Sequence, residues 1–359
     1  MEVRVLLNSP VSAPTSLGTP AANPTTLSAS AANVKRNATG RGDLSGDDSL
    51  RAENPDGERA LRYNEGWTMP VSPPPSSTWF RDSFNEDYRR IYAGRDQAAA
   101  EAEVDRVVEE LGLVAGERVL DICCGFGRHL VAFHRRGIPA VGVDLSPALL
   151  GQAPSGLQGY LAQADMRQLP FQGGGGSQGG GESRGDGGGF SAWVSFFTSF
   201  GYFESAAEHA QAAGEMARVL RPGGRFAMDL PNLEPTVRNL RPRTERSIGT
   251  LRVVEERRYD RSTRRVEKKT VLLEPETPAA ASPLEGASAD KSRSARRKQY
   301  FESVRLFTAT EIHDLLGSVG LEVNRVLGDF DGRPYEGDAP RMILLGRRTE
   351  RETRCQPPH

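Results

Sequence analysis

The sequence predicts a doubly wound α/β domain with a mostly parallel sheet of seven strands. Short apolar runs alternate with helix-favouring segments across residues 86–232, a pattern typical of strands separated by helices. Several of these runs end near an aspartate, and in such sheets the carboxyl ends of the strands hold ligands. Beyond Pro231 the pattern changes to charged, alternating segments that favour antiparallel strands.

The two ends of the chain lack this pattern. Residues 1–78 are dominated by Ala, Ser, Thr, Pro and Gly, which predicts a disordered or targeting tail. Acidic residues are scarce up to Asp43, as in organelle transit peptides, and a plain disordered tail is equally compatible. Residues 348–359 form a second predicted tail, so the folded domain is expected at 79–347. The expected location is the cytoplasm, or an organelle if the first tail is a transit peptide.

Composition and charge narrow the classes of function. The formal net charge is −1, so no overall field would hold the chain on nucleic acid or on an anionic membrane. No apolar run approaches the roughly 18 to 20 residues that span a bilayer. Cys123, Cys124 and Cys355 give neither a disulfide framework nor a metal-binding spacing, which predicts an intracellular protein without a bound metal.

The first expected elements surround a turn of small residues. Residues 84–111 are rich in Ala, Glu and Arg and predict one long helix that ends at Gly112. Residues 118–123 follow as a buried strand. Residues 123–127 then turn the chain into a helix predicted at 128–136.

The next elements continue the alternation. A second buried strand is predicted at 138–144, and a short helix should begin at Ser146 and Pro147, which favour the N-cap and the first turn. Residues 159–165 fit a third strand. Gly, Ser and charged residues fill 172–189, which predicts a flexible insertion.

Four further strands complete the sheet. The apolar run at 190–197 predicts a fourth strand, 206–220 the helix after it, and 225–231 a fifth strand. A helix and a closing pair of strands are expected near the end of the domain, at 308–320, 321–328 and 340–348.

Residues 233–307 are expected to form a small antiparallel cap that shapes the pocket at the strand ends. Strands are predicted at 251–260 and 268–276, and a further one at 300–308. Residues 276–297 are low in complexity and predict a linker. Three side chains are expected to contribute to the same pocket, namely those of Arg305, Asp329 and Tyr335.

Acidic residues mark the strand ends. Asp121, Asp144 and Asp165 follow one another along the first three strands. Because one carboxylate can accept hydrogen bonds from two vicinal ribose hydroxyls, Asp144 is placed to bind a nucleoside. Gly125 and Gly127 leave room for a ligand in the turn, although glycines there also serve strand–helix packing. The helix that follows offers free N–H groups to an anion.

Five strings resemble, in order, the successive motifs of class I S-adenosylmethionine-dependent methyltransferases: VLDICCGFGRH, AVGVDLS, AQADMRQLPF, FFTSFGYF and ARVLRPGGRFAMDLP. The resemblance covers about 79–347 and is specific for the superfamily. It implies a Rossmann-like methyltransferase fold, S-adenosylmethionine as the cofactor, and methyl transfer to an acceptor that is expected to be a small molecule. The sequence departs from the family at Cys123, where the acidic-x-Gly-x-Gly pattern usually has Gly.

The resemblance also implies site residues. Asp121 and Gly125 would contact the methionine end, Asp144 the ribose, and Asp165 the adenine amine, while Met166 would pack on the ring or simply fill the core. The full set expected around the cofactor is Tyr92, Arg95, Asp121, Cys123, Gly125, Gly127, Asp144, Leu145, Asp165, Met166 and Phe197.

An aromatic segment precedes the domain core. Trp79, Tyr88, Tyr92 and Arg95 resemble the amino-terminal lid of small-molecule methyltransferases, in which Arg95 would meet the cofactor carboxylate and the lid would exclude water. The alternative is that Tyr88 and Tyr92, four residues apart, form a contact stripe on a helix.

Tyr202 and Asp229 are the expected catalytic residues. Tyr202 follows the fourth strand, where the acceptor should lie, and aromatic rings there would stabilise the sulfonium by about 1 to 2 kcal/mol. Asp229, at the end of the fifth strand, would orient the acceptor or take its proton. His129 and His209 lie inside predicted helices, which favours structural roles for both.

Two other functions compete with methyl transfer. A nicotinamide-dependent oxidoreductase would need Gly-x-Gly-x-x-Gly or Ala, and Leu130 stands at the last position. A non-catalytic scaffold that binds RNA or protein is the other alternative. Base-methylating relatives often carry Asn-Pro-Pro-Tyr after the fourth strand, whereas FFTSFGYF stands here, so a nucleic-acid acceptor is not expected.

Overall fold

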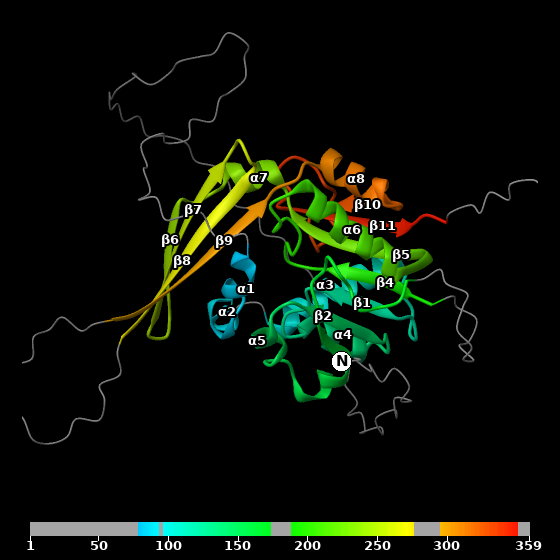
Figure 1. Ribbon diagram of the computed structural model, residues 1–359, viewed down its shortest axis with the longest axis horizontal. Coiled ribbons are helices and arrows are strands. Elements are labelled where there is room, and N and C mark those ends of the chain that lie inside the picture. Colours follow the sequence, from blue (N-terminus) through cyan, green and yellow to red (C-terminus); the bar gives the residue numbers. More distant parts are fainter. Residues whose placement is uncertain (1–77, 93–95, 174–187, 276–294, 351–359) are drawn as a thin grey trace, which may run out of the picture. The chain divides into compact units, whose positions relative to one another are not determined.

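The computed structural model describes residues 78–92, 96–173, 188–275 and 295–350. The expectations for the amino-terminal tail, for most of the two low-complexity segments and for Arg95 fall outside these residues and stay predictions. The folded part contains two sheets, with helices around them (Figure 1).

The central sheet confirms the predicted fold class. Its strand order is β10-β11-β5-β4-β1-β2-β3. The strands from β5 to β3 run parallel, whereas β11 pairs antiparallel with both β5 and β10. The strands span β1 Val119–Ile122, β2 Ala140–Asp144, β3 Leu161–Gln163, β4 Phe190–Ser195, β5 Leu220–Pro231, β10 Leu321–Leu327 and β11 Arg341–Arg348. This order places the carboxyl ends of β1, β2 and β4 side by side.

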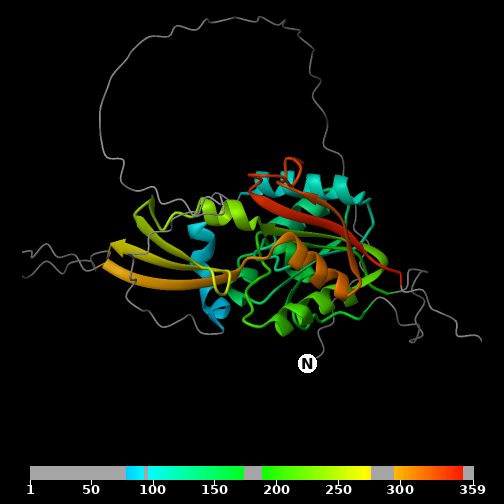
Figure 2. The same cartoon turned by 90° about the horizontal axis from the view of Figure 1, so that it is seen from above.

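Helices cover both faces of this sheet (Figure 2). On one face α3 and α4 pack through residues such as Val107 and Phe133, and on the other α6 and α8 pack through residues such as Met216 and Leu316. The helices span α3 Gln97–Leu111, α4 Arg128–Arg135, α5 Pro147–Leu150, α6 Ala206–Val219, α7 Leu233–Arg238 and α8 Ala309–Ser318, with a 3-10 helix at Ser155–Tyr160. No helix among the described residues is long and apolar enough to cross a membrane.

Capping residues set where several helices begin. Ser146 caps α5, and Ser205 and Thr308 form capping boxes at α6 and α8, as side-chain oxygens there accept otherwise unpaired backbone N–H groups. The single helix predicted at 84–111 is wrong for the same reason. Asn85 and Asp96 each accept a backbone N–H bond and begin a new helix, so the segment divides into α2 Glu86–Ile91 and α3. A short helix, α1 Trp79–Ser83, precedes them.

The second sheet is antiparallel, as predicted for this region. It comprises β6 Arg243–Ile248, β7 Leu251–Asp260, β8 Arg265–Pro275 and β9 Ala295–Arg305, in that order. The expected pair forms its centre as β7 and β8, and β6 is an additional edge strand. Ile91 of α2 packs into an apolar cluster with Leu251, Val253 and Leu272, so α2 lies on one face of this sheet.

Candidate functional site

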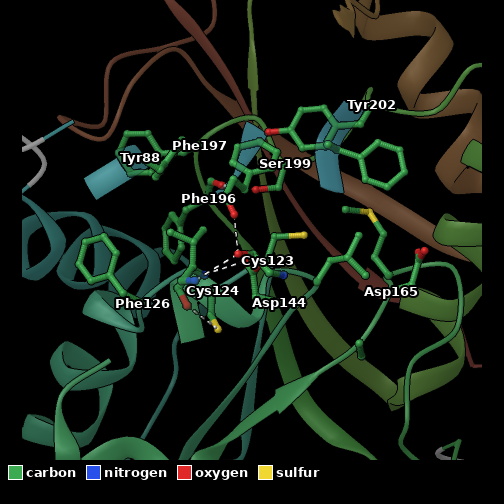
Figure 3. A pocket seen from close by; sticks show the side chains of 18 of the residues that line it. Tyr88, Cys123, Cys124, Phe126, Asp144, Asp165, Phe196, Phe197, Ser199 and Tyr202 are labelled. Atoms are coloured by element: carbon green, nitrogen blue, oxygen red, sulfur yellow. Dashed lines mark hydrogen bonds between the residues drawn. The ribbon is translucent and has the colours of Figure 1, made fainter. Parts of the chain in front are cut away.

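A pocket opens at the carboxyl ends of β1, β2 and β4. It encloses about 1020 Å³ with its open mouth included, which is enough for a nucleoside cofactor and a small second molecule. Tyr88, Phe197 and Tyr202 lie on one side of it and Cys124 and Asp144 on the other (Figure 3). Of the residues predicted around the cofactor or acceptor, those that line the pocket are Tyr92, Cys123, Gly125, Asp144, Leu145, Asp165, Met166, Phe197 and Tyr202. Asp121, Gly127 and Asp229 do not line it.

The turn after β1 bends sharply around this pocket. Gly125 and Gly127 have φ angles of 57° and 78°, in the left-handed region that glycine adopts at no steric cost. A Cβ on Gly127 would lie 2.8 Å from Leu157 Cδ1, so this position also needs glycine for packing. Cys123 has φ 64° and adopts the same conformation with a side chain. The departure from the family pattern therefore falls at a position whose backbone favours Gly.

Asp144 joins the ends of β1 and β2. Its Oδ2 accepts from the Gly125 N–H and its Oδ1 from the Ser146 N–H, each at 2.8 Å. Burial raises the pKa of Asp144, and these N–H groups oppose the shift. Two carboxylate oxygens offer about four acceptor positions, so the side chain retains capacity for ribose hydroxyls.

Asp121 lies buried beside the pocket and is 1 % exposed. Its Oδ2 has no hydrogen-bond partner among the described residues, and the nearest ring nitrogen, Nδ1 of His129, lies 3.9 Å away. Burial raises the pKa of Asp121 to about 8, against the opposing effect of Arg128. An unpaired buried oxygen costs about 1 to 3 kcal/mol, so a donor from a ligand in the adjacent turn would fit this place.

His129, for which the sequence favoured a structural role, forms a polar group with Glu103, a residue that the sequence analysis did not single out. His129 lines the pocket, stacks on Phe196, and is joined through Nε2 to Glu103 Oε2 at 2.8 Å. Arg128 also lines the pocket and lies 3.0 Å from the same oxygen. The sequence signal that could have revealed this group is Glu103, a carboxylate that stands between Ala100 and Val107 on the apolar face of α3.

An ion pair lies at the side of the pocket that is expected to hold adenine. Asp165 accepts from its neighbour Arg167 at 2.6 Å through Nη2 and at 3.0 Å through Nε. Asp165 lines the pocket, but its carboxylate is already paired with Arg167. Met166 both lines the pocket and belongs to the buried core, so its filling of the core is observed and its packing on an adenine ring stays a prediction.

Phe84, Tyr88, Tyr92 and Tyr202 form what we call the aromatic wall. Ring centroids lie 5.6 Å apart between Phe84 and Tyr202, 5.2 Å between Phe84 and Tyr88, and 4.7 Å between Tyr88 and Tyr92. Ser146 Oγ donates to the carbonyl oxygen of Phe84 at 2.5 Å and so ties the wall to the end of β2. Tyr88 and Tyr92 therefore touch each other and line the pocket, as each alternative for them required.

The antiparallel sheet supports this wall from behind. Lys268 Nζ donates to Tyr92 OH at 2.6 Å, and Arg246 donates to the carbonyl oxygen of Ile91 at 3.0 Å. Asp87 of α2 accepts from Lys298 Nζ at 2.6 Å. None of the described residues of 233–275 and 295–307 lines the pocket, so the expectation that the cap itself shapes it is corrected for these residues. Helices α1 and α2 lie between the antiparallel sheet and the pocket. The side chains of Arg305, Asp329 and Tyr335, which were expected to contribute, do not line the pocket either.

Asp229 has a different position from the one predicted. Its Oδ2 accepts from the Phe197 N–H at 2.8 Å, and Arg341 Nη1 lies 2.6 Å from the same oxygen. The residue is buried and does not line the pocket. Strand alternation turns it into the core, where it holds Phe197 and Thr198 in the left-handed conformation. This placement gives no support to an acid–base role for Asp229.

A family model described as Methyltransferase domain matches residues 92–326 of the 359. The chain belongs to this methyltransferase family. Our inference from the sequence motifs is confirmed at the level of family and fold, and family membership supports S-adenosylmethionine as the cofactor rather than a nicotinamide nucleotide.

Relatives of this methyltransferase include several that act on sugars by name. A dTDP-3-amino-3,4,6-trideoxy-alpha-D-glucopyranose N,N-dimethyltransferase from Streptomyces venezuelae is 32% identical over 140 residues, which are 38% of this chain and 52% of the relative. The chain thus spans about half the length of the curated relatives it matches.

Two solved structures show the same fold. A sugar N-methyltransferase from Streptoalloteichus sp. is 24% identical, with a TM-score of 0.53 over 82% of this chain and 100% of the other. An S-adenosylmethionine-bound amino pentose methyltransferase from Micromonospora echinaspora is 23% identical, with a TM-score of 0.52 over 73% and 96%.

Proposed function

We propose that this chain transfers a methyl group from S-adenosylmethionine to a small-molecule acceptor. The observation that carries the proposal is the buried carboxylate of Asp144, fixed by the N–H groups of Gly125 and Ser146 at the edge of a pocket with an aromatic wall opposite. A fixed carboxylate of this kind suits ribose recognition, and the aromatic rings suit a cationic sulfonium. When bound, the cofactor would supply a methyl group that is already activated by its sulfonium.

The chain's own residues would bind and orient. Asp144 would hold the ribose, Gly125 and Cys123 would admit the methionine end to the turn, and Met166 would pack against the adenine. The unpaired Oδ2 of Asp121 fits a donor at the methionine end. Holding donor and acceptor in line can lower the barrier by several kcal/mol, which is the main contribution that this reaction needs from a protein.

The acceptor that we propose is an amine-bearing small molecule. Methylation of a neutral amine leaves the positive charge on nitrogen, and the faces of aromatic rings stabilise a desolvated cation by about 2 kcal/mol. Tyr88, Tyr92 and Tyr202 offer such faces in the pocket. The names of the amino-sugar relatives point to the same chemistry. Nucleic acid is not the proposed partner, and the cytoplasm remains the expected location.

Binding of S-adenosylhomocysteine, measured by titration calorimetry, tests the cofactor site. Asp144→Asn is expected to weaken binding at least about tenfold, since one charged acceptor is worth about 1.5 to 3 kcal/mol. Asp314→Asn, at an exposed position of α8, is the matched control and should bind as wild type does. Binding of NAD without S-adenosylhomocysteine would instead support the oxidoreductase alternative.

Methyl transfer itself is tested with isotopically labelled S-adenosylmethionine and a pool of small metabolites. The expected result is label on an amine, lost in the Asp144→Asn protein. Label on RNA alone would contradict the proposed acceptor class. Label on no molecule, despite cofactor binding, would favour the non-catalytic scaffold alternative.

A further inference from the structure

The loop between β4 and α6 contributes side chains to both ends of the pocket. Phe196 and Phe197 come first and lie near the turn that follows β1, where Phe196 stacks on His129. Tyr202 and Phe203 come later and contact the rings of α1 and of the residues around it. Asp229 fixes the backbone at the start of this loop, and the buried rings of Phe200 and Phe203 anchor its second half in the core. The backbone of the second half has a separate hydrogen-bonding support.

Arg265, the first residue of β8, supplies that support. Its Nη1 donates to the carbonyl oxygen of Phe203 at 2.9 Å, and its Nη2 lies 3.2 Å from that of Tyr202 and 3.5 Å from that of Gly201. The guanidinium is itself fixed to β9, because Nε donates to Ser303 Oγ and Nη2 to the Ser303 carbonyl oxygen, both at 2.7 Å. One side chain thus links three consecutive peptide groups to the antiparallel sheet.

Close packing brings these carbonyl groups within reach of a single guanidinium. Gly201 has φ 109°, and a Cβ there would lie 2.5 Å from the carbonyl oxygen of Arg305. The Arg305 N–H donates to the carbonyl oxygen of Gly201 at 2.8 Å. Arginine presents five N–H donors in a rigid planar fork, whereas lysine has three donors on one atom. A lysine at position 265 could not serve all five acceptor atoms.

We propose that Arg265 is a positioning residue through which the antiparallel sheet sets the acceptor-facing side of the pocket. This inference rests on the proposed function, which defines that side as the place of the acceptor. Arg265 does not line the pocket and acts through Tyr202 and Phe203. The residues that would face the cofactor are held by the central sheet. We therefore expect the affinity of the protein for the cofactor not to depend on Arg265.

Arg265→Lys in the full chain tests the proposal with three measurements. Hydrogen exchange should accelerate at least about tenfold at the amides of 201–204, because local opening there becomes easier. The ¹⁹F resonance of Tyr202, in protein labelled with 3-fluorotyrosine and assigned with Tyr202→Phe, should shift or broaden. The affinity for S-adenosylhomocysteine should stay unchanged. Arg258→Lys is the matched control, since Arg258 on the same sheet is 59% exposed and pairs with Glu267.

Three results would overturn the proposal. In the first, hydrogen exchange at 201–204 in Arg265→Lys matches that of wild type. In the second, exchange accelerates as much in β5 and β11 as at 201–204, which would make Arg265 a general stabiliser. A parallel loss of S-adenosylhomocysteine affinity would place its effect on the cofactor side instead. If Arg265→Lys does not fold, Ser303→Ala removes only the hydroxyl that holds Nε, and the absence of any local change in it would count equally against the proposal. Failure of wild-type protein to bind S-adenosylhomocysteine would contradict the proposed function, but the hydrogen-exchange result would still test whether Arg265 holds residues 201–204.

Discussion

Asp229 and Arg341 form an ion pair of 2.6 Å beneath Phe197, where the carboxylate is 1% and the guanidinium 27% exposed. The pair spans two strands that neighbour each other in the sheet, β5 and β11. Its carboxylate also fixes the backbone of the loop that lines the pocket.

Asp229→Ala is expected to lower the free energy of unfolding by about 3 kcal/mol, because it removes the closer and more deeply buried of the two carboxylates that pair with Arg341. Urea unfolding measures the change. Asp331→Ala, which breaks an exposed pair with Arg333, is the control and should leave stability nearly unchanged. Equal effects of the two substitutions would show that burial does not strengthen the Asp229 pair.

Lys268 should contribute far more to the stability of the fold than its neighbour Lys269. Burial alone would lower the pKa of Lys268, but the carboxylate of Glu302, 2.6 Å away, and the hydroxyl of Tyr92 together outweigh burial and raise the pKa. Lys268→Met would leave Glu302 and the hydroxyl of Tyr92 without their donor, at an expected cost of about 3 kcal/mol, with faster hydrogen exchange in α2. Lys269→Met, on the opposite face of β8, is the control. A similar loss in both variants would contradict the support of α2 by Lys268.

Cys123 offers a test of backbone strain. A residue with a side chain pays roughly 1 to 2 kcal/mol in the left-handed region, and glycine does not. Cys123→Gly is therefore expected to be more stable than Cys123→Ala by about 1 kcal/mol, measured by chemical denaturation. Both variants lose the thiol, so the comparison isolates the conformation. An alanine variant as stable as the glycine variant would refute the strain.

His209 should make stability depend on pH. Burial among aromatic rings lowers its pKa from 6.5 to about 4. Below pH 6.5 the unfolded chain gains a proton that the folded chain resists, so stability is complete above pH 6.5 and is lost as the pH falls toward 4. At 1.36 kcal/mol per pKa unit the loss is about 3 kcal/mol. The free energy of unfolding, measured with urea at several pH values across this window, should fall more steeply with falling pH in wild type than in His209→Gln. An equal pH dependence in the two proteins would exclude His209 as the cause.

Strand positions were predictable because apolar runs and their aspartates follow from local sequence. The break between α2 and α3 was predictable in principle from Asn85 and Asp96, but both lie within a segment whose composition favours a helix throughout. The strand β6 alternates exposed and half-buried residues, which leaves too weak an apolar signal.

Side-chain partners were harder to predict than strands. Asp229 was correctly expected on the fifth strand, yet its role depends on Arg341, which lies 112 residues away in the sequence. Glu103 meets His129 across 26 residues, and Arg265 meets Phe203 across 62. Such pairings follow from tertiary packing and leave no periodic pattern in the chain.

Ser146 joins the two sides of the pocket in one residue: its N–H holds Asp144, and its hydroxyl holds the backbone of Phe84. Under the proposed function, we therefore expect binding of the nucleoside to Asp144 and ordering of the segment around Phe84 to be coupled. Coupling of this kind is reciprocal, so an acceptor that orders this segment would strengthen retention of the methyl donor by the same factor that the donor strengthens binding of the acceptor.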